Sequence, residues 1–193
     1  MTLLVAGLVL FLGIHSLPMV PSVRGGLQSK LGENGYKGLF ALVSFAGFGL
    51  LIYGYGLARM DGSPILYDPP LWARHLTMLL MLPVFIFLVA AYVPCRIKVA
   101  LKHPMLVAVK LWAFAHLLAN GDLASVLLFG GFLVWAVVDR ISVKRRGPGA
   151  GQLAFVSGKP GKLSDIGVIL AGLVVYGLFV WKLHPLLIGV PVV

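Results

Sequence analysis

One apolar stretch of the chain, residues 103–122, carries several side chains that could do chemistry. Its polar residues are His103, Lys110, His116, Asn120 and Asp122. Placing an ionisable side chain in the hydrocarbon of a membrane costs several kcal/mol, so such residues are rare there and usually face a partner, a cavity or a cofactor. We therefore expect the function of the protein to depend on this stretch.

His116 is the leading candidate for a ligand within it. Residues three or four positions apart share a helix face, so Trp112, Ala113 and Asn120 lie beside His116. The small Ala113 next to the bulky Trp112 predicts room for a flat group. A neutral imidazole with a free nitrogen is a good metal ligand, and the alternative role is a hydrogen bond between helices.

A second imidazole, His15, lies near the end of the first apolar segment. At about 1.5 Å of rise per residue, His15 lies roughly 20 Å and His116 roughly 10 Å below the outer face. This offset is too large for a direct hydrogen bond. It is compatible with two imidazoles on opposite faces of one metal centre, provided that their helices are neighbours. Haem iron accepts axial imidazole, whereas zinc would want three or four close ligands. The alternative for His15 is a hydrogen bond within the core.

The remaining charged residues of these segments have both structural and functional interpretations. Lys110 is a candidate counter-charge for an anion or a haem propionate; alternatively it pairs with Asp139 or extends to the membrane interface. Asp122 is expected to cap the N-terminus of the next helix. We expect Asp139 and Arg140 to form an interfacial ion pair.

The composition identifies an integral membrane protein with one all-helical domain, residues 1–193. Of the 193 residues, 60% are hydrophobic and 11% are charged, against about 25% charged residues in soluble domains. The net charge of +10 is best explained by cationic loops that face lipid headgroups, not by nucleic acid. The single cysteine, Cys95, excludes an intrachain disulfide and a multi-cysteine metal site.

Six segments approach the length of about 20 residues that a spanning helix needs. They are residues 2–20, 37–58, 72–93, 103–119, 123–140 and 164–183. The first is expected to be a retained helix because it lacks the features of a cleaved signal peptide. A tight Asn-Gly-Asp turn joins the fourth and fifth segments into a hairpin. The segment 184–191 is too short to span, so we expect a re-entrant or interfacial piece or a cap over the bundle.

The distribution of lysine and arginine predicts the orientation in the membrane, because cytoplasmic loops are enriched in these residues. The loops after the first, third and fifth segments hold twelve cations: Arg24, Lys30, Lys37, Arg96, Lys98, Lys102, Arg140, Lys144, Arg145, Arg146, Lys159 and Lys162. The opposite side holds three: Arg59, Arg74 and Lys182. Both termini are therefore expected outside the cytoplasm.

The motifs of hydrolases and of NTP-binding proteins do not occur in the chain. There is no Gly-x-Ser-x-Gly, His-Glu-x-x-His or phosphate-loop sequence, and Glu33 is the only glutamate. These absences argue against hydrolytic chemistry and NTP use.

Several short runs carry a resemblance to a known family. They are Gly13-Ile-His15-Ser, His103-Pro104, the run from Trp112 to Asp122, the run from Trp135 to Asp139, and His184-Pro185. Together they resemble the NnrU family of bacterial membrane proteins, which is associated with denitrification and nitric oxide metabolism and also takes in plant 15-cis-zeta-carotene isomerase. In the isomerase branch a haem b is held by two histidines, which correspond to His15 and His116.

The resemblance thus implies haem b as cofactor, with His15 and His116 as metal ligands. From their places on the helix and their chemistry, we expect Trp112, Asn120 and Lys110 to contribute to the same cofactor site. One departure is Ala113, where the isomerase carries a cysteine implicated in ligand switching; a redox-switched isomerase mechanism is therefore in doubt. A second similarity, of Lys102-His103-Pro104 to isoprenylcysteine-type membrane methyltransferases, is an analogy of fold only.

The function implied is that of an accessory or redox-sensing protein in nitrogen-oxide metabolism at the bacterial inner membrane. Its partners would be membrane redox or nitric oxide reductase components. Two alternatives stay open: a haem-dependent cis-trans isomerase of a lipophilic polyene, and a transporter or assembly partner without a cofactor.

Overall fold

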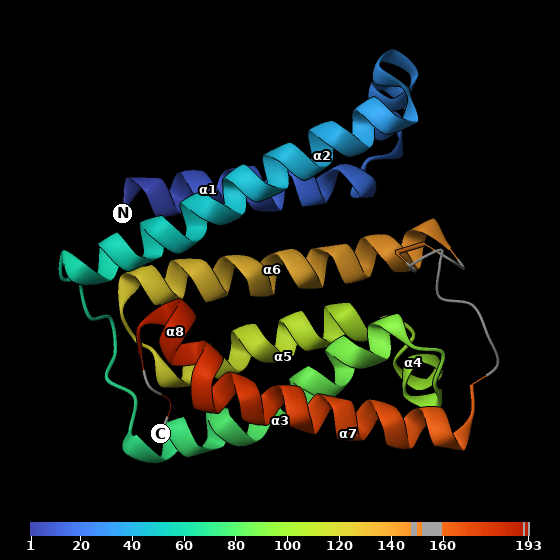
Figure 1. The fold of residues 1–193 in the computed structure, drawn as a ribbon. Helices are drawn as coiled ribbons and strands as arrows, with labels where there is room; N and C mark the ends of the chain where they lie inside the picture. The colour runs from blue at the N-terminus through green and yellow to red at the C-terminus, as the bar shows by residue number, and fades with distance from the viewer. Residues whose placement is uncertain (148–149, 152–159, 191, 193) are drawn as a thin grey trace.

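The computed structural model describes residues 1–147, 150–151, 160–190 and 192. Its elements are α1 (Thr2–Ser16), η1 (Leu17–Met19), α2 (Pro21–Met60), α3 (Leu71–Tyr92), α4 (Arg96–Leu101), α5 (Pro104–Ala119), α6 (Leu123–Arg146), α7 (Lys162–Leu178), η2 (Phe179–Leu183) and α8 (His184–Ile188). In these described residues extended pairing is limited to an isolated bridge between Ile65 and Asp122. The expected all-helical class is confirmed (Figure 1).

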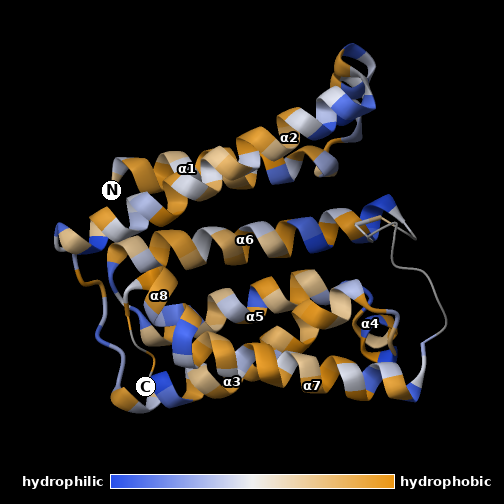
Figure 2. Ribbon diagram, in the orientation of Figure 1, coloured by the Kyte–Doolittle hydropathy of each residue, from blue (hydrophilic) through white to orange (hydrophobic). Residues whose placement is uncertain are grey.

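Most of these helices have the length and composition of membrane spans. Among the described residues, five stretches meet both criteria: Thr2–Met19, Pro21–Met60, Leu71–Tyr92, Leu123–Arg146 and Lys162–Ile188. Figure 2 shows hydrophobic residues along the bodies of the helices and hydrophilic residues gathered mostly at their ends. The protein is therefore a multi-pass membrane protein. The fourth expected segment, which forms α5, has 16 residues and rises only about 24 Å, less than the roughly 30 Å of a bilayer core.

Helix α6 lies in the middle of the bundle (Figure 1). The α1–α2 hairpin packs on one side of it, and α5 packs on the other, followed by α3 and α7. A buried cluster of Leu4, Leu51, Ala58 and Ala124 joins the hairpin to α6. On the opposite side, the Thr77 hydroxyl of α3 donates a 2.7 Å hydrogen bond to the Ala115 carbonyl of α5, the kind of polar contact that joins helices in a membrane.

The α1–α2 hairpin depends on glycines at the points of closest approach. A Cβ on Gly54 would lie 2.4 Å from the Leu4 nitrogen, and one on Gly7 would lie 2.6 Å from the Leu51 nitrogen. Because the opposing atoms belong to the backbone, they cannot turn aside. Small residues commonly permit such close packing between membrane helices, so these glycines set the distance between α1 and α2.

Helix α2 begins earlier than the expected segment 37–58. Its range contains a break at Gly32, where φ is 70° and ψ is 170°, a backbone conformation that glycine adopts at little cost. The sequence predicts a loop before Gly32, whereas the structure shows helix from Pro21. Proline at this first position favours a helix start.

The turn between α5 and α6 is held by Asp122, as expected. Its carboxylate accepts hydrogen bonds from the Ser125 nitrogen at 3.0 Å and the Ser125 hydroxyl at 2.6 Å. Burial opposes ionisation of Asp122, but hydrogen bonds from Ser125 and Ser63 and the charge of Arg59 outweigh it, so the pKa of Asp122 lies below its usual value. The ionised carboxylate is therefore the form that stabilises this helix start.

The C-terminal segment continues from α7. Residues Phe179–Leu183 form a π-helical turn that runs from α7 directly into α8. The apolar helical stretch thus extends from Lys162 to Ile188, with His184-Pro185 at the start of the short α8. Such π-turns often occur at functional sites.

Replacing Gly54 with alanine should destabilise the protein by about 1–3 kcal/mol, because the new methyl group overpacks the α1–α2 contact. A Cβ added at Gly56 in the same helix would have no atom within 4 Å, so Gly56→Ala should be neutral or slightly stabilising through helix propensity. Thermal unfolding in detergent measures the stability of both variants. Equal unfolding temperatures for the two variants would contradict the assigned role of Gly54.

Replacing Asp122 with alanine should cost about 1 kcal/mol through loss of the helix cap, whereas Asp122→Asn should retain most of the capping. The pKa of Asp122 is lower in the folded than in the unfolded protein, so its contribution is present at neutral pH and is lost as pH falls through the folded value. The stability difference between wild type and Asp122→Ala, from unfolding at pH 7 and pH 3, should therefore shrink in acid. A difference that grows in acid would refute this sign.

Candidate functional site

His15 lies in the last turn of α1 within a group of aromatic rings. Its ring stacks on Phe11 with centroids 4.2 Å apart and meets the edges of Phe40 and Trp135 at 5.0 and 6.2 Å. Its Nδ1 lies 2.7 Å from the Phe11 carbonyl oxygen. A carbonyl only accepts hydrogen bonds, so Nδ1 carries the hydrogen and Nε2 carries the lone pair. That lone pair has no hydrogen-bond donor in the described part of the chain.

His116 shows the same arrangement on α5. Its Nδ1 lies 2.9 Å from the Trp112 carbonyl oxygen, which again assigns the lone pair to Nε2. Its ring stacks on Phe129 of α6 with centroids 4.6 Å apart and lies 5.4 Å from the ring of Trp112. Both histidines are therefore oriented by the carbonyl four residues earlier and by a stacked phenyl ring.

An aromatic layer connects the two histidines. The Phe132 ring of α6 lies 5.7 Å from Phe11 and 5.3 Å from Trp112. Three aromatic residues of α6 take part: Phe129, Phe132 and Trp135. They are spaced three residues apart, so they lie along one side of the helix. This spacing is visible in the sequence, but the expected site did not include the phenylalanines.

The condition that the helices of His15 and His116 are neighbours is not met. Helix α6 lies between α1 and α5 (Figure 1), and the contacts from one histidine to the other pass through Phe11, Phe132 and Trp112. The neighbours of the two imidazoles on α6, Trp135 and Phe129, are six residues apart, or about 9 Å along the axis. The rise between these two neighbours is similar to the offset of roughly 10 Å that the sequence predicts for the two histidines.

Two other residues of the α5 face take part in hydrogen bonding at the helix end and in packing. The side-chain nitrogen of Asn120 donates a 2.9 Å hydrogen bond to the His116 carbonyl, and the Asn120 carbonyl accepts one from the Tyr67 hydroxyl. Asn120 thus helps to end α5. Ala113 is fully buried, so the space predicted beside Trp112 is already filled.

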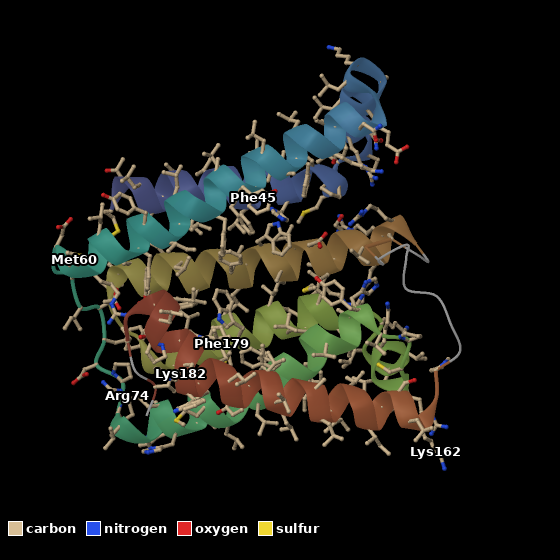
Figure 3. All side chains as sticks on the ribbon, in the orientation of Figure 1. Phe45, Met60, Arg74, Lys162, Phe179 and Lys182 are labelled. Atoms are coloured by element: carbon tan, nitrogen blue, oxygen red, sulfur yellow. The ribbon has the colours of Figure 1, made fainter. Side chains whose placement is uncertain are left out.

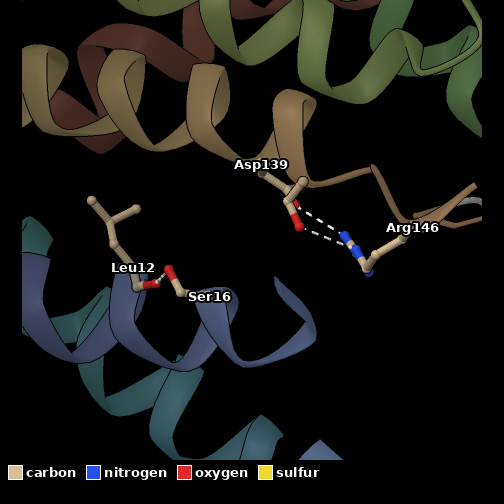
Figure 4. A network of polar contacts seen from close by, with 5 residues as sticks. Leu12, Ser16, Asp139 and Arg146 are labelled. Atoms are coloured by element: carbon tan, nitrogen blue, oxygen red, sulfur yellow. Dashed lines mark hydrogen bonds and ion pairs between the residues drawn. The ribbon is translucent and has the colours of Figure 1, made fainter. Parts of the chain in front are cut away.

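The charges near the site are paired differently from the prediction. Asp139 forms its ion pair with Arg146, with a 3.2 Å contact from the guanidinium to the carboxylate (Figure 4). The expected pairs of Asp139 with Lys110 and with Arg140 are therefore both wrong, because Arg146, seven residues later, reaches back to the carboxylate. Lys110 is half-buried and has no ion pair within the described residues.

The donor atoms suit haem better than a free metal ion. Within the part of the chain that the structure describes, no group of three or more His, Cys, Asp or Glu side chains could hold a metal. Two imidazoles that each present Nε2 match the two axial positions of a haem iron, whose other ligands come from the porphyrin. The Phe132 ring occupies part of the space between them, so a porphyrin there requires this ring to turn aside.

Comparisons with known proteins are consistent with these observations and define the family. No curated protein and no solved structure matches the chain significantly. The model of the NnrU protein family matches residues 3–192, nearly the whole chain. The chain therefore belongs to the NnrU protein family.

Proposed function

We propose that this NnrU-family protein binds haem b against the aromatic residues of α6, with His15 of α1 and His116 of α5 as axial ligands. We further propose that it serves nitrogen-oxide metabolism at the bacterial inner membrane as an accessory or redox-sensing protein. One observation carries the haem assignment. In both imidazoles Nδ1 donates a hydrogen bond to a backbone carbonyl, so the lone pair of Nε2 is left for a metal.

This state is the one that metal-bound histidines commonly have. A ligating imidazole usually donates its other ring nitrogen to a carbonyl or carboxylate, which fixes the tautomer and the ring orientation and raises the basicity of the ligating nitrogen. Phe11 and Phe129 stack on the two rings and hold them further. A helix–helix hydrogen bond, the alternative role, would engage Nε2.

The surrounding residues would assist the haem in different ways. Trp112 and Phe132 would provide apolar surface to the porphyrin, and half-buried Lys110 is the candidate counter-charge for a propionate. Haem bound there would supply a redox-active iron. Ala113 offers no sulfur ligand and is fully buried, so it gives no support to the isomerase mechanism with ligand switching.

The orientation in the membrane is part of the same proposal. The α1–α2 and α3–α5 junctions, the end of α6 and the start of α7 lie at one end of the bundle, and both termini lie at the other (Figure 1). Figure 3 shows Arg74 and Lys182 at the end with the termini and Lys162 at the opposite end. Because cytoplasmic loops carry most of the lysine and arginine, we assign the cation-rich end to the cytoplasm and the termini to the opposite face.

Purified protein from cells supplied with haem should show a Soret band with the spectrum of a bis-histidine haem. His15→Ala and His116→Ala should each abolish or alter it, since each removes one axial ligand. The matched control is His75→Ala, because His75 is an exposed histidine on α3. A normal bis-histidine spectrum in both ligand variants would overturn the assignment, and a wild type that binds no haem would favour the cofactor-free assembly or transport role.

The orientation predicts which engineered cysteines react from outside intact cells. In a Cys95→Ser background, Thr2→Cys should react with a membrane-impermeant maleimide, whereas Lys144→Cys should react only after the membrane is broken, because the two positions lie at opposite ends of the bundle. Labelling of Lys144→Cys and not Thr2→Cys in intact cells would reverse the orientation.

A further inference from the structure

A cavity of about 160 Å³ lies where α3, α4, α5 and α6 meet at the cation-rich end of the bundle. Ala91, Pro104, Met105, Leu106 and Trp135 form its apolar walls. Lys98, Lys102, His103 and Asp139 also line it. Ligand sites in proteins are commonly lined by apolar side chains with a few polar groups, and this cavity has such a lining. The cavity is separate from the space between His15 and His116.

The polar lining of the cavity has an excess of positive charge. Lys98 and Lys102 line it directly, and Arg140 and Arg146 act electrostatically on His103. The one carboxylate, Asp139, is already paired with Arg146. Its negative charge is therefore compensated within the protein, and the two lysines are left to face a ligand.

Hydrogen-bond donors at the cavity are also available. The indole Nε1 of Trp135 is buried and has no hydrogen-bond partner among the described residues. The Lys98 ammonium makes a hydrogen bond to the Ala91 carbonyl at 3.1 Å, which leaves further hydrogens because an ammonium has three. The Lys98 ammonium can therefore also donate to a ligand in the cavity that accepts hydrogen bonds.

The backbone at Lys102 is strained. Lys102 has φ of 64° and ψ of −45° and is the one residue other than glycine with positive φ in the described chain. Strained backbone of this kind costs free energy and is concentrated at functional sites, including ligand sites. Here the strain ends α4, allows α5 to start at Pro104 and leaves Lys102 on the cavity wall.

The pKa of His103, which precedes α5, is affected by the same positive charges. Burial, and then the charges of Arg140, Arg146 and Lys102, hold the pKa of His103 below its usual value. Its imidazole is therefore largely neutral at pH 7 and can donate or accept a hydrogen bond. The permanent charges of the site come from the lysines and arginines.

We propose that this cavity binds the phosphate group of an anionic phospholipid. Phosphate matches the clustered lysines, and the apolar walls would receive the glycerol and the first part of the acyl chains. Basic pockets between membrane helices on the cytoplasmic side are known to bind such headgroups. The proposal does not depend on haem.

The test uses the full-length protein, purified in a neutral detergent and titrated with phosphatidylglycerol, with bound lipid counted by native mass spectrometry. Lys98→Gln combined with Lys102→Gln should weaken binding roughly tenfold or more, since each cation near a lipid surface contributes about 1 kcal/mol. The control, Lys144→Gln with Lys162→Gln, removes the same charge from exposed positions outside the cavity and should bind as wild type does.

Two further measurements distinguish loss of the lipid site from a folding defect, and a bound phospholipid from a bound free anion. Lys98→Arg with Lys102→Arg retains the charge and should bind lipid, so a loss of binding there as well would count against the charge-based site. Millimolar inorganic phosphate should leave the lipid bound; displacement would show that the site takes the phosphate of a soluble molecule. Equal lipid binding by the glutamine pair and the control pair would overturn the proposal.

Discussion

The shortness of α5 is the constraint on which most of the structure depends. A helix of 16 residues does not cross the bilayer core, and backbone groups left unpaired in hydrocarbon are costly. At one end, the Tyr67 hydroxyl donates to the carbonyls of Leu117 and Asn120, and Leu66 and Tyr67 both donate to the Gly121 carbonyl. At the other end, α5 starts at Pro104, which has no N–H to satisfy. Polar groups therefore gather at both ends of α5.

Helix α6 brings the residues of α1 and α5 together at one site. Its capped start fixes the α5–α6 hairpin, and its aromatic residues then lie against both α1 and α5. The α1–α2 hairpin can approach α6 as one unit because its own helices are in backbone contact at Gly7 and Gly54. His15 is thus placed by packing among three helices, whereas His116 is placed by its own helix and Phe129.

The sequence predicted the individual helices better than it predicted which helices pack against each other. Apolar segments, the Asp122 cap and the depth offset of His15 and His116 follow from local chemistry and from the rise of a helix, so they could be derived residue by residue. Which helix lies between two others depends on long-range packing that no periodicity encodes; this is why the position of α6 between α1 and α5 could not be predicted. The partner of Asp139 was missed for a related reason, because the long Arg146 side chain spans two helical turns to reach it.

Trp135 links the histidine site to the basic cavity. Its ring meets the edge of His15 at 6.2 Å, and the same residue lines the cavity with an indole nitrogen that lacks a partner among the described residues. Because interiors are closely packed and respond to small shifts, the position of this one side chain affects the packing both around His15 and at the cavity wall. The histidine site and the cavity therefore share one residue of α6.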